Sequence, residues 1–168
     1  ELVVHLPFRQ RLVTDIDIFN DAVLDYHREL IKFSVEMGAE KFVVHADMRD
    51  QDSESQELEL PEQIRKLKQI GEENGAEVCF ENIGHWSGIE LFELGEMLEE
   101  LDASMCFDTG HAFSEVGQEE MEEFLDEYSH IISHLHLQDT REGRDMHLPI
   151  GSEEIEFEPV GEKLEEFK

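Results

Sequence analysis

The sequence predicts an α/β fold in which helices cover a parallel β-sheet, and three observations lead to this class. Five short apolar segments alternate with five amphipathic segments along the 168 residues. This alternation is typical of βαβ units, in which successive strands run parallel. Hydrophobic residues make up 39% of the chain, which is enough for a packed core. The first apolar segment leads into HLPFRQRL (5–12), which is not the glycine-rich phosphate loop of an open, doubly wound sheet.

The first unit and the second strand are defined by periodicity and by stop signals. ELVVH (1–5) is the first expected strand. Apolar residues then recur at steps of three and four between positions 19 and 37, which predicts a helix that ends at Gly38. KFVVH (41–45) is the second expected strand, and the acidic segment 46–59 is expected to be a loop.

The middle of the chain repeats this order. We expect a helix to begin at Pro61 and to stop at Gly75, because proline favours the first turn of a helix and glycine its end. EVCFE (77–81) is the third expected strand. A loop and a helix at 89–101 follow, and SMCFD (104–108) is the fourth expected strand.

The last units are a short acidic helix at 118–129 and a fifth strand, IISHLHL (131–137). A long polar loop is expected at 138–157, and Pro159 is expected to begin the last helix. We therefore expect one domain, residues 1–168, made of about five βα units. Because a closed barrel of this type needs eight units, the chain is expected to be an incomplete barrel.

Composition limits the classes of function. No segment approaches the roughly 20 apolar residues of a membrane span, and no secretory signal pattern is present. Cys79 and Cys106 lie inside apolar segments and are expected to be buried, reduced thiols. We therefore expect a cytoplasmic protein without a membrane partner.

The net charge of −30 arises from 43 acidic and 13 basic residues. A heavily acidic surface suits a high-salt (halophilic) cytoplasm, where ions screen the self-repulsion. The same charge argues against a nucleic-acid partner, whose binding rests on Lys and Arg contacts to phosphates. Two local basic patches remain in the sequence, Arg9 with Arg11 and Arg141 with Arg144.

Each of the five expected strands ends in a residue of a type that binds metals. These residues are His5, His45, Glu81, Asp108 and His136. In parallel βα folds the functional site is built at the carboxyl edge of the strands. His111, Asp145 and His147 follow in the loops. Such a pool of nitrogen and oxygen ligands suits Zn²⁺, Mn²⁺, Fe²⁺ or Co²⁺ better than Ca²⁺, so we expect a divalent metal site.

These residues also have purely structural interpretations. A carboxylate at a strand end, such as Asp108, caps the helix that follows it. His5 and His45 are alternatively core histidines or residues that orient the ligands. His27 is expected at the surface. Trp86 either lines the mouth of the site or packs within its loop.

Six motifs, taken in order, resemble the xylose-isomerase-like barrel superfamily. They are VVHLPF, KFVVHAD, VCFENIG, MCFDTGHAF, HLHLQD and DMHLPIG. The superfamily includes sugar and sugar-phosphate isomerases and epimerases, and also the endonuclease IV group. The resemblance covers residues 1 to about 160. It implies a (β/α)8 TIM barrel of which strands three to seven are present here.

The epimerase branch of this superfamily binds one divalent metal through a Glu, an Asp, a His and a second Glu. The first three map onto Glu81, Asp108 and His136, and the second Glu belongs to a last strand that we expect to be absent. The resemblance implies that His111 binds the metal or the substrate, and that Arg141 contacts a substrate hydroxyl or phosphate. The implied cofactor is Mn, Zn, Co or Mg, and the implied assembly is a homodimer.

The expected activity is therefore that of a metal-dependent isomerase or epimerase acting on a sugar or sugar phosphate. In this mechanism two carboxylates move a proton through a metal-stabilised enediolate, and Glu81 is the candidate for one of them. A small-molecule sugar is the expected substrate. A barrel fragment without activity is a further alternative, because one ligand would be missing.

The endonuclease branch is the second enzymatic interpretation. Its trinuclear zinc site, which cleaves phosphodiesters at abasic DNA, would also use His5, His45, His111, Asp145 and His147. Three features favour the sugar branch. The segment 136–151 lacks the lysine of the endonuclease motif, no second cysteine precedes His111, and the charge of −30 disfavours a duplex partner.

Overall fold

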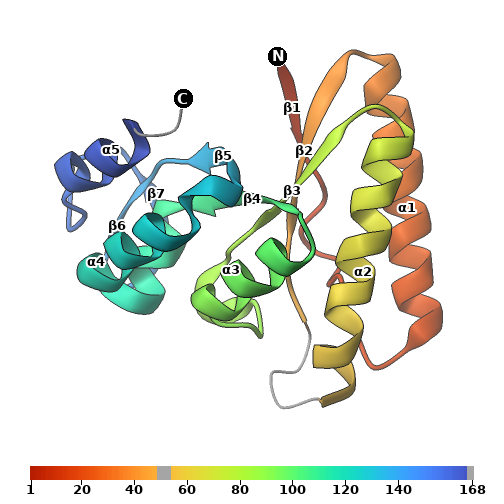
Figure 1. The fold of residues 1–168 in the computed structure, drawn as a ribbon, viewed down its shortest axis with the longest axis horizontal. Coiled ribbons are helices and arrows are strands. Elements are labelled where there is room, and N and C mark those ends of the chain that lie inside the picture. Colours follow the sequence, from red (N-terminus) through yellow and green to blue (C-terminus); the bar gives the residue numbers. More distant parts are fainter. Residues whose placement is uncertain (49–53, 166–168) are drawn as a thin grey trace.

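Five parallel strands form one curved sheet in chain order (Figure 1). The computed structural model describes residues 1–48 and 54–165. The strands are β1 (Leu2–His5), β2 (Ala39–His45), β3 (Glu77–Glu81), β4 (Ser104–Asp108) and β5 (Ile132–His136). All neighbouring pairs are parallel. The α/β class is confirmed, and the strands form an arc of five where a closed (β/α)8 barrel has eight.

Five α-helices in the described residues accompany the sheet, each following one strand or the hairpin after β5. They are α1 (Asp17–Glu36), α2 (Glu54–Glu73), α3 (Leu91–Glu100), α4 (Thr109–Tyr128) and α5 (Phe157–Glu165). Helices α1 and α2 lie side by side over β1 to β3 (Figure 1). This is the arrangement that right-handed βαβ connections produce.

The two faces of the sheet bury different side chains. Phe42 and Val44 point to the helices and belong to the main hydrophobic core. Val43 alternates with them and packs with Cys79 and Cys106 on the other face of the sheet, because successive side chains of a strand point to opposite faces. Both cysteines are buried free thiols, as predicted.

The register of the strands brings their carboxyl ends together. His45 pairs with Glu81 across β2 and β3. Asp108 pairs with His136 across β4 and β5. The predicted strand-end residues therefore line one edge of the sheet.

Helix α4 begins at once after β4, whereas the sequence predicted a helix only from residue 118. The helix has two parts, because Gly117 adopts φ 80° and ψ −176° between them. A glycine tolerates this positive φ without the strain that a side chain would add. His111 consequently lies in the first turn of a helix and not in a loop.

Helix α2 begins at Glu54, inside the segment predicted to be a loop, and Pro61 lies within it rather than at its start. Leu60, Ile64 and Leu67 are fully buried at steps of four and three residues. Their packing offsets the cost of a proline in a helix interior, which is about 3 kcal/mol. Residues 49–53 of the predicted loop lie outside the described residues.

The predicted polar loop at 138–157 contains an antiparallel hairpin. Its strands are β6 (Asp139–Arg141) and β7 (Arg144–Leu148). Glu142 and Gly143, between them, both have positive φ, at 54° and 64°. Two-residue hairpin turns of the mirror-image type require this geometry. Among the described helices, none is long and apolar enough to cross a bilayer.

Candidate metal centre

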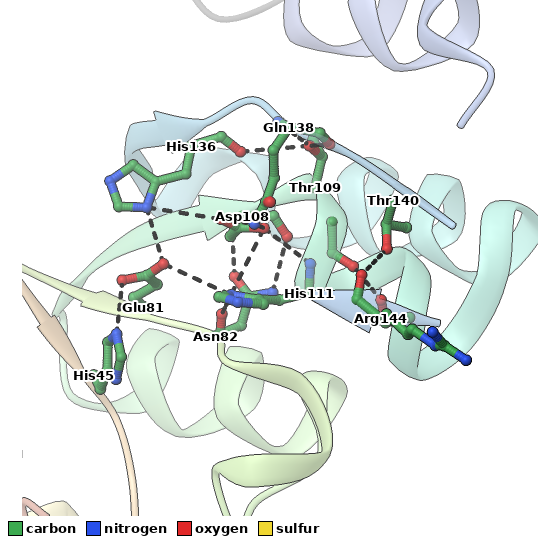
Figure 2. Close-up of polar contacts among 12 residues, drawn as sticks. His45, Glu81, Asn82, Asp108, Thr109, His111, His136, Gln138, Thr140 and Arg144 are labelled. Carbon is green, nitrogen blue, oxygen red and sulfur yellow. Dashed lines mark hydrogen bonds and ion pairs between the residues drawn. The ribbon is translucent and has the colours of Figure 1, made fainter. Parts of the chain in front are cut away.

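The carboxylate of Glu81, at the end of β3, lies at the centre of a group of imidazoles (Figure 2). His5 Nε2 and His136 Nδ1 each donate to one of its oxygens at 2.9 Å. His45 Nε2 lies 3.4 Å from one oxygen and His111 Nδ1 lies 3.7 Å from the other. Since Glu81 is only 2% exposed, side chains rather than water compensate its charge.

The electrostatics of this group favour an ionised Glu81. Burial alone would raise the pKa of its carboxyl group, but the hydrogen bonds from His136 and His5 outweigh burial and bring the pKa well below its usual range. The same hydrogen bonds raise the pKa of both histidines. Burial lowers the pKa of His45 to about 4, so this ring is neutral at pH 7.

Two of the imidazoles are oriented by backbone carbonyls. His5 Nδ1 donates to the Leu6 carbonyl at 2.7 Å, and His111 Nδ1 donates to the Asn82 carbonyl at 2.9 Å. Because a carbonyl oxygen can only accept, Nδ1 carries the proton in both rings. Metal-binding histidines characteristically donate their second ring N–H in this way. Nε2 is therefore the nitrogen with which each ring would bind a metal, and His5 would give up its Nε2 proton on doing so.

Asp108 caps a helix and also lies among the candidate metal ligands. As the N-cap of α4, it accepts a hydrogen bond from the His111 backbone N–H at 2.9 Å. Gln138 Nε2 donates to its two oxygens at 2.9 and 2.8 Å. Burial raises the pKa of the Asp108 carboxyl group. His136 Nδ1 lies 3.8 Å away, so Asp108 and Glu81 share this imidazole.

The donor atoms fit a divalent cation. Among the described residues, three sets place one ligand atom from each member within 4.8 Å of one another. These sets are His5, His45 and Glu81; Glu81, Cys106 and His136; and Glu81, Asp108 and His111. The buried carboxylates of Glu81 and Asp108 belong to the same set. Two negative charges this close repel each other unless a cation compensates them. The mixture of imidazole nitrogen and carboxylate oxygen suits Zn²⁺, Mn²⁺ or Co²⁺.

A cavity of about 980 Å³ opens beside this group. His147 lines it, with its ring centroid 6.4 Å from that of His111. Phe8 and Trp86 supply apolar surface to the cavity wall. The ring centroid of Phe8 lies 5.9 Å from that of His45, and the ring centroid of Trp86 lies 6.3 Å from that of His111. A volume of this size is typical of small-molecule sites.

The structure brings most of the residues predicted for the site together, with two exceptions. Arg141 is exposed, forms an ion pair with Glu153 and is not among the described residues that line the cavity. The side chain of Asp145 lies outside the described part of the chain. Sequence reasoning missed Asn82, which donates to the Asp108 carbonyl and accepts from the Asp108 N–H.

The surface position predicted for His27 is wrong. The residue is 1% exposed on the inner side of α1, and burial lowers its pKa to about 4. The signal was present in the sequence, because His27 follows Leu24 and precedes Ile31 at helical spacing.

Comparisons with known proteins concern the family and the fold. Residues 1–168 match the family model described as Xylose isomerase-like TIM barrel. An uncharacterized protein of Methanocaldococcus jannaschii is 26% identical over 177 residues, which cover 99% of this chain and 60% of the relative. The chain thus spans about three fifths of the length of this curated relative.

Several solved structures have the same fold. A D-tagatose 3-epimerase-like protein has a TM-score of 0.83 at 26% identity, covering 99% of this chain and 67% of its own. D-allulose 3-epimerase from Methylomonas sp., in complex with D-allulose, has a TM-score of 0.79 at 12% identity. The match covers 98% of this chain and 58% of the epimerase. The IOLI protein with a bound zinc atom has a TM-score of 0.76 at 15% identity. The match covers 99% of this chain and 63% of the IOLI protein.

The last two similarities, at such low identity, show the fold alone. The family model extends over every residue of the chain, and its barrel agrees with the observed arc of parallel strands. The chain therefore belongs to the xylose isomerase-like TIM barrel family.

Proposed function

We propose that this chain is part of a metal-dependent isomerase or epimerase that moves a proton at the carbon next to the carbonyl of a sugar or sugar phosphate. The observation that carries the proposal is the buried carboxylate of Glu81, shared by three sets of potential metal ligands beside a cavity. The D-tagatose 3-epimerase-like protein and the D-allulose 3-epimerase among the similar structures, and the zinc atom bound in the IOLI protein, support it.

Glu81, Asp108 and His136 would hold the metal, with His111 as a further ligand or as a substrate contact. A bound divalent cation would polarise the substrate carbonyl and stabilise negative charge on its oxygen. His111 has its Nδ1 proton fixed by Asn82, which orients the ring toward the cavity that it lines. The rings of Phe8 and Trp86 supply apolar surface to the cavity.

In this proposal Glu81 accepts the proton from the substrate carbon at a carboxylate oxygen. It is ionised at neutral pH, because the hydrogen bonds of His136 and His5 overcome the effect of burial on its pKa. A general base must be deprotonated before the reaction, and Glu81 meets this condition. We assign the return of the proton to the second Glu of the family pattern, on the last strand of the full barrel.

Glu81→Gln tests the proposal. We expect the variant to lose at least about 100-fold in rate, as is usual when a general base is removed. The measurement is the exchange of the carbon-bound hydrogen of D-tagatose, D-fructose and their phosphates with D2O, followed by NMR in protein loaded with Mn²⁺ or Co²⁺. This exchange needs only one proton acceptor.

The matched control is Glu96→Gln, an exposed carboxylate on α3, which should exchange hydrogen at the parent rate. Exchange by Glu81→Gln at the parent rate would remove Glu81 from its assigned role. Absence of exchange with every ketose tried, in protein with full metal occupancy, would contradict the proposed function itself.

A phosphodiesterase is the second candidate, and one observation favours it. His5 and His45 form a ligand set with Glu81, and His147 lines the same cavity, so that several metals have donors available. Clustered zinc ions would then activate water and stabilise the leaving oxygen of a phosphodiester. Elemental analysis separates the candidates. About one metal per chain supports the isomerase, and two or three zinc ions with cleavage of abasic-site DNA support the phosphodiesterase.

A further inference from the structure

Arg9 differs from every other arginine whose side chain the structure describes, because it has no carboxylate partner within ion-pair distance. The paired arginines are Arg11 with Asp47, Arg28 with Asp25, Arg65 with Glu62, Arg141 with Glu153 and Arg144 with Glu142. The chain has 43 acidic and 13 basic residues, so carboxylates outnumber cations more than threefold. An unpaired guanidinium is therefore unexpected at a random surface position.

Arg9 lines the cavity beside the candidate metal centre. It lies in the segment between β1 and α1, and hydrogen bonds fix this segment on both sides. Leu6 N–H donates to the Val43 carbonyl at 2.8 Å before Arg9, and Leu12 N–H donates to Asp47 Oδ1 at 2.8 Å after it. The backbone that presents Arg9 is thus held in place before a ligand arrives, which lowers the entropic cost of binding.

The neighbouring cation, Arg11, is already engaged. Its Nη1 donates to Asp47 Oδ2 at 2.8 Å and to the Trp86 carbonyl at 2.7 Å. Asp47 is 1% exposed and compensates the charge of Arg11 locally. Arg9 is consequently the cavity-lining arginine whose charge no described carboxylate neutralises.

We propose that Arg9 binds the anionic group, a phosphate or a carboxylate, of a charged sugar whose carbonyl end lies at the Glu81 metal centre. This inference rests on the proposed function and narrows its substrate class from sugars in general to anionic sugars. The planar guanidinium donates two parallel N–H groups to a phosphate or carboxylate. A neutral sugar offers no charge to Arg9, and in a protein of net charge −30 an anion needs such a local cation.

Trp86 provides the measurement, because it is the chain's single tryptophan and lines the same cavity. Its fluorescence in metal-loaded protein would be titrated with two pairs of ligands. D-Fructose 6-phosphate against D-fructose tests a phosphate, and D-glucuronate against D-glucose tests a carboxylate. We expect one anionic sugar to bind at least about 10-fold more tightly than its neutral parent.

Arg9→Gln should abolish this preference and leave the affinity for the neutral sugar unchanged. Arg65→Gln, an exposed arginine on α2, is the matched control and should keep the preference. Equal affinities for the charged and neutral members of both pairs would overturn the inference, and so would a preference that survives Arg9→Gln.

The failures of the two proposals are distinguishable. If ketoses exchange their hydrogen but Arg9→Gln binds anionic sugars as tightly as the parent does, the proposed function holds and the inference about Arg9 is overturned. If an anionic sugar binds through Arg9 but no ketose exchanges its hydrogen, the anion site stands and the isomerase proposal fails.

Discussion

Single side chains that are not expected to bind the metal still set the geometry of those that do, and Gln138 is one of them. It donates to both oxygens of Asp108 and thereby fixes the plane of this carboxylate (Figure 2). Gly110 makes room for it, because a Cβ there would lie 2.8 Å from the Gln138 side chain. Gln138 follows His136 by two residues, yet nothing in the local sequence pattern shows that it contacts another strand's carboxylate.

We predict that Gln138→Leu lowers the affinity for Mn²⁺ or Zn²⁺ about 10- to 100-fold, since removing a residue that orients a metal ligand has effects of this size. Isothermal titration of the metal-free protein measures it. Gln69→Leu, on the exposed side of α2, is the control. Unchanged affinity in Gln138→Leu would mean that Asp108 is either not a ligand or is held by its helix cap alone.

His27 gives a prediction about stability against pH. Burial lowers its pKa from 6.5 to about 4, so between these values the unfolded chain binds a proton that the folded chain does not. The free energy of unfolding therefore falls as the pH drops from 6.5 toward 4, by about 3 kcal/mol in all from this residue. Above pH 6.5 the residue is neutral in both states and contributes no pH dependence.

His27→Leu should remove this part of the acid destabilisation. Urea unfolding at several pH values between 4 and 7 measures it, and the difference in slope between parent and variant isolates His27 from the other titrating groups. Gln10→Leu, which places a leucine at an exposed position without changing a titrating group, should keep the parent slope. Identical slopes in the parent and His27→Leu would contradict the prediction.

At the scale of secondary structure elements, β6 and α5 are joined through one carboxylate. Asp139, at the start of β6, accepts hydrogen bonds from the backbone N–H groups of Thr140, Glu153, Glu154 and Ile155, at 2.7 to 3.1 Å. It is fully buried, and so are Thr140 and Ile155, so that two of these amides lie in residues without ready access to water. One side chain thus fastens the segment before α5 to the hairpin.

We expect Asp139→Ala to destabilise the protein by about 3 kcal/mol or more, because each buried amide left without a partner costs about 1–3 kcal/mol. The measurements are the midpoint of urea unfolding and the rate of proteolysis in segment 149–157, which should rise. Asp21→Ala, at an exposed position on α1, is the control. A change below about 1 kcal/mol would show that other contacts hold this segment.

The elements that the sequence failed to predict have identifiable reasons. All five strands and their terminal residues were predictable, since apolar runs and ligand-type residues coincide there. The early start of α4 was hidden because Gly117 interrupts the helical periodicity. The hairpin was hidden because its turn uses Glu142-Gly143 instead of an Asn-Gly or Asp-Gly pair, the usual signal for this geometry.

The candidate site was more predictable than its surroundings. His5, His45, Glu81, Asp108 and His136 are strand ends, and parallel strands bring such ends together without further information. Arg9 and Arg11 were visible as a basic pair, but only tertiary contacts distinguish the paired arginine from the unpaired one. Arg141 pairs instead with Glu153, 12 residues away, and no periodicity reveals this contact.

At the scale of the whole molecule, the net charge of −30 is the dominant property. Raising NaCl from about 0.1 to about 1 M shortens the screening length from about 10 to about 3 Å, which weakens repulsion between surface carboxylates. We predict that Tm rises by more than about 4 °C over this range, equivalent to more than about 1 kcal/mol. NaCl is preferable to sulfate, which strengthens hydrophobic burial by itself.

Differential scanning calorimetry at neutral pH measures this effect. Sucrose, which stabilises by exclusion without screening charge, serves as the comparison at matched water activity. A Tm that is independent of NaCl, or that falls with it, would contradict the interpretation of the acidic surface as an adaptation to salt.

The bonds of Arg11 have a consequence for how such a site can be re-engineered. TIM-barrel enzymes diversify by exchanging individual βα loops while the strands remain. Here one guanidinium ties the loop after β1 to Asp47 in the loop after β2 and to the Trp86 carbonyl in the loop after β3. These contacts make the three loops interdependent, and grafting the loop after β2 alone onto another barrel would leave the buried Asp47 carboxylate without its cation.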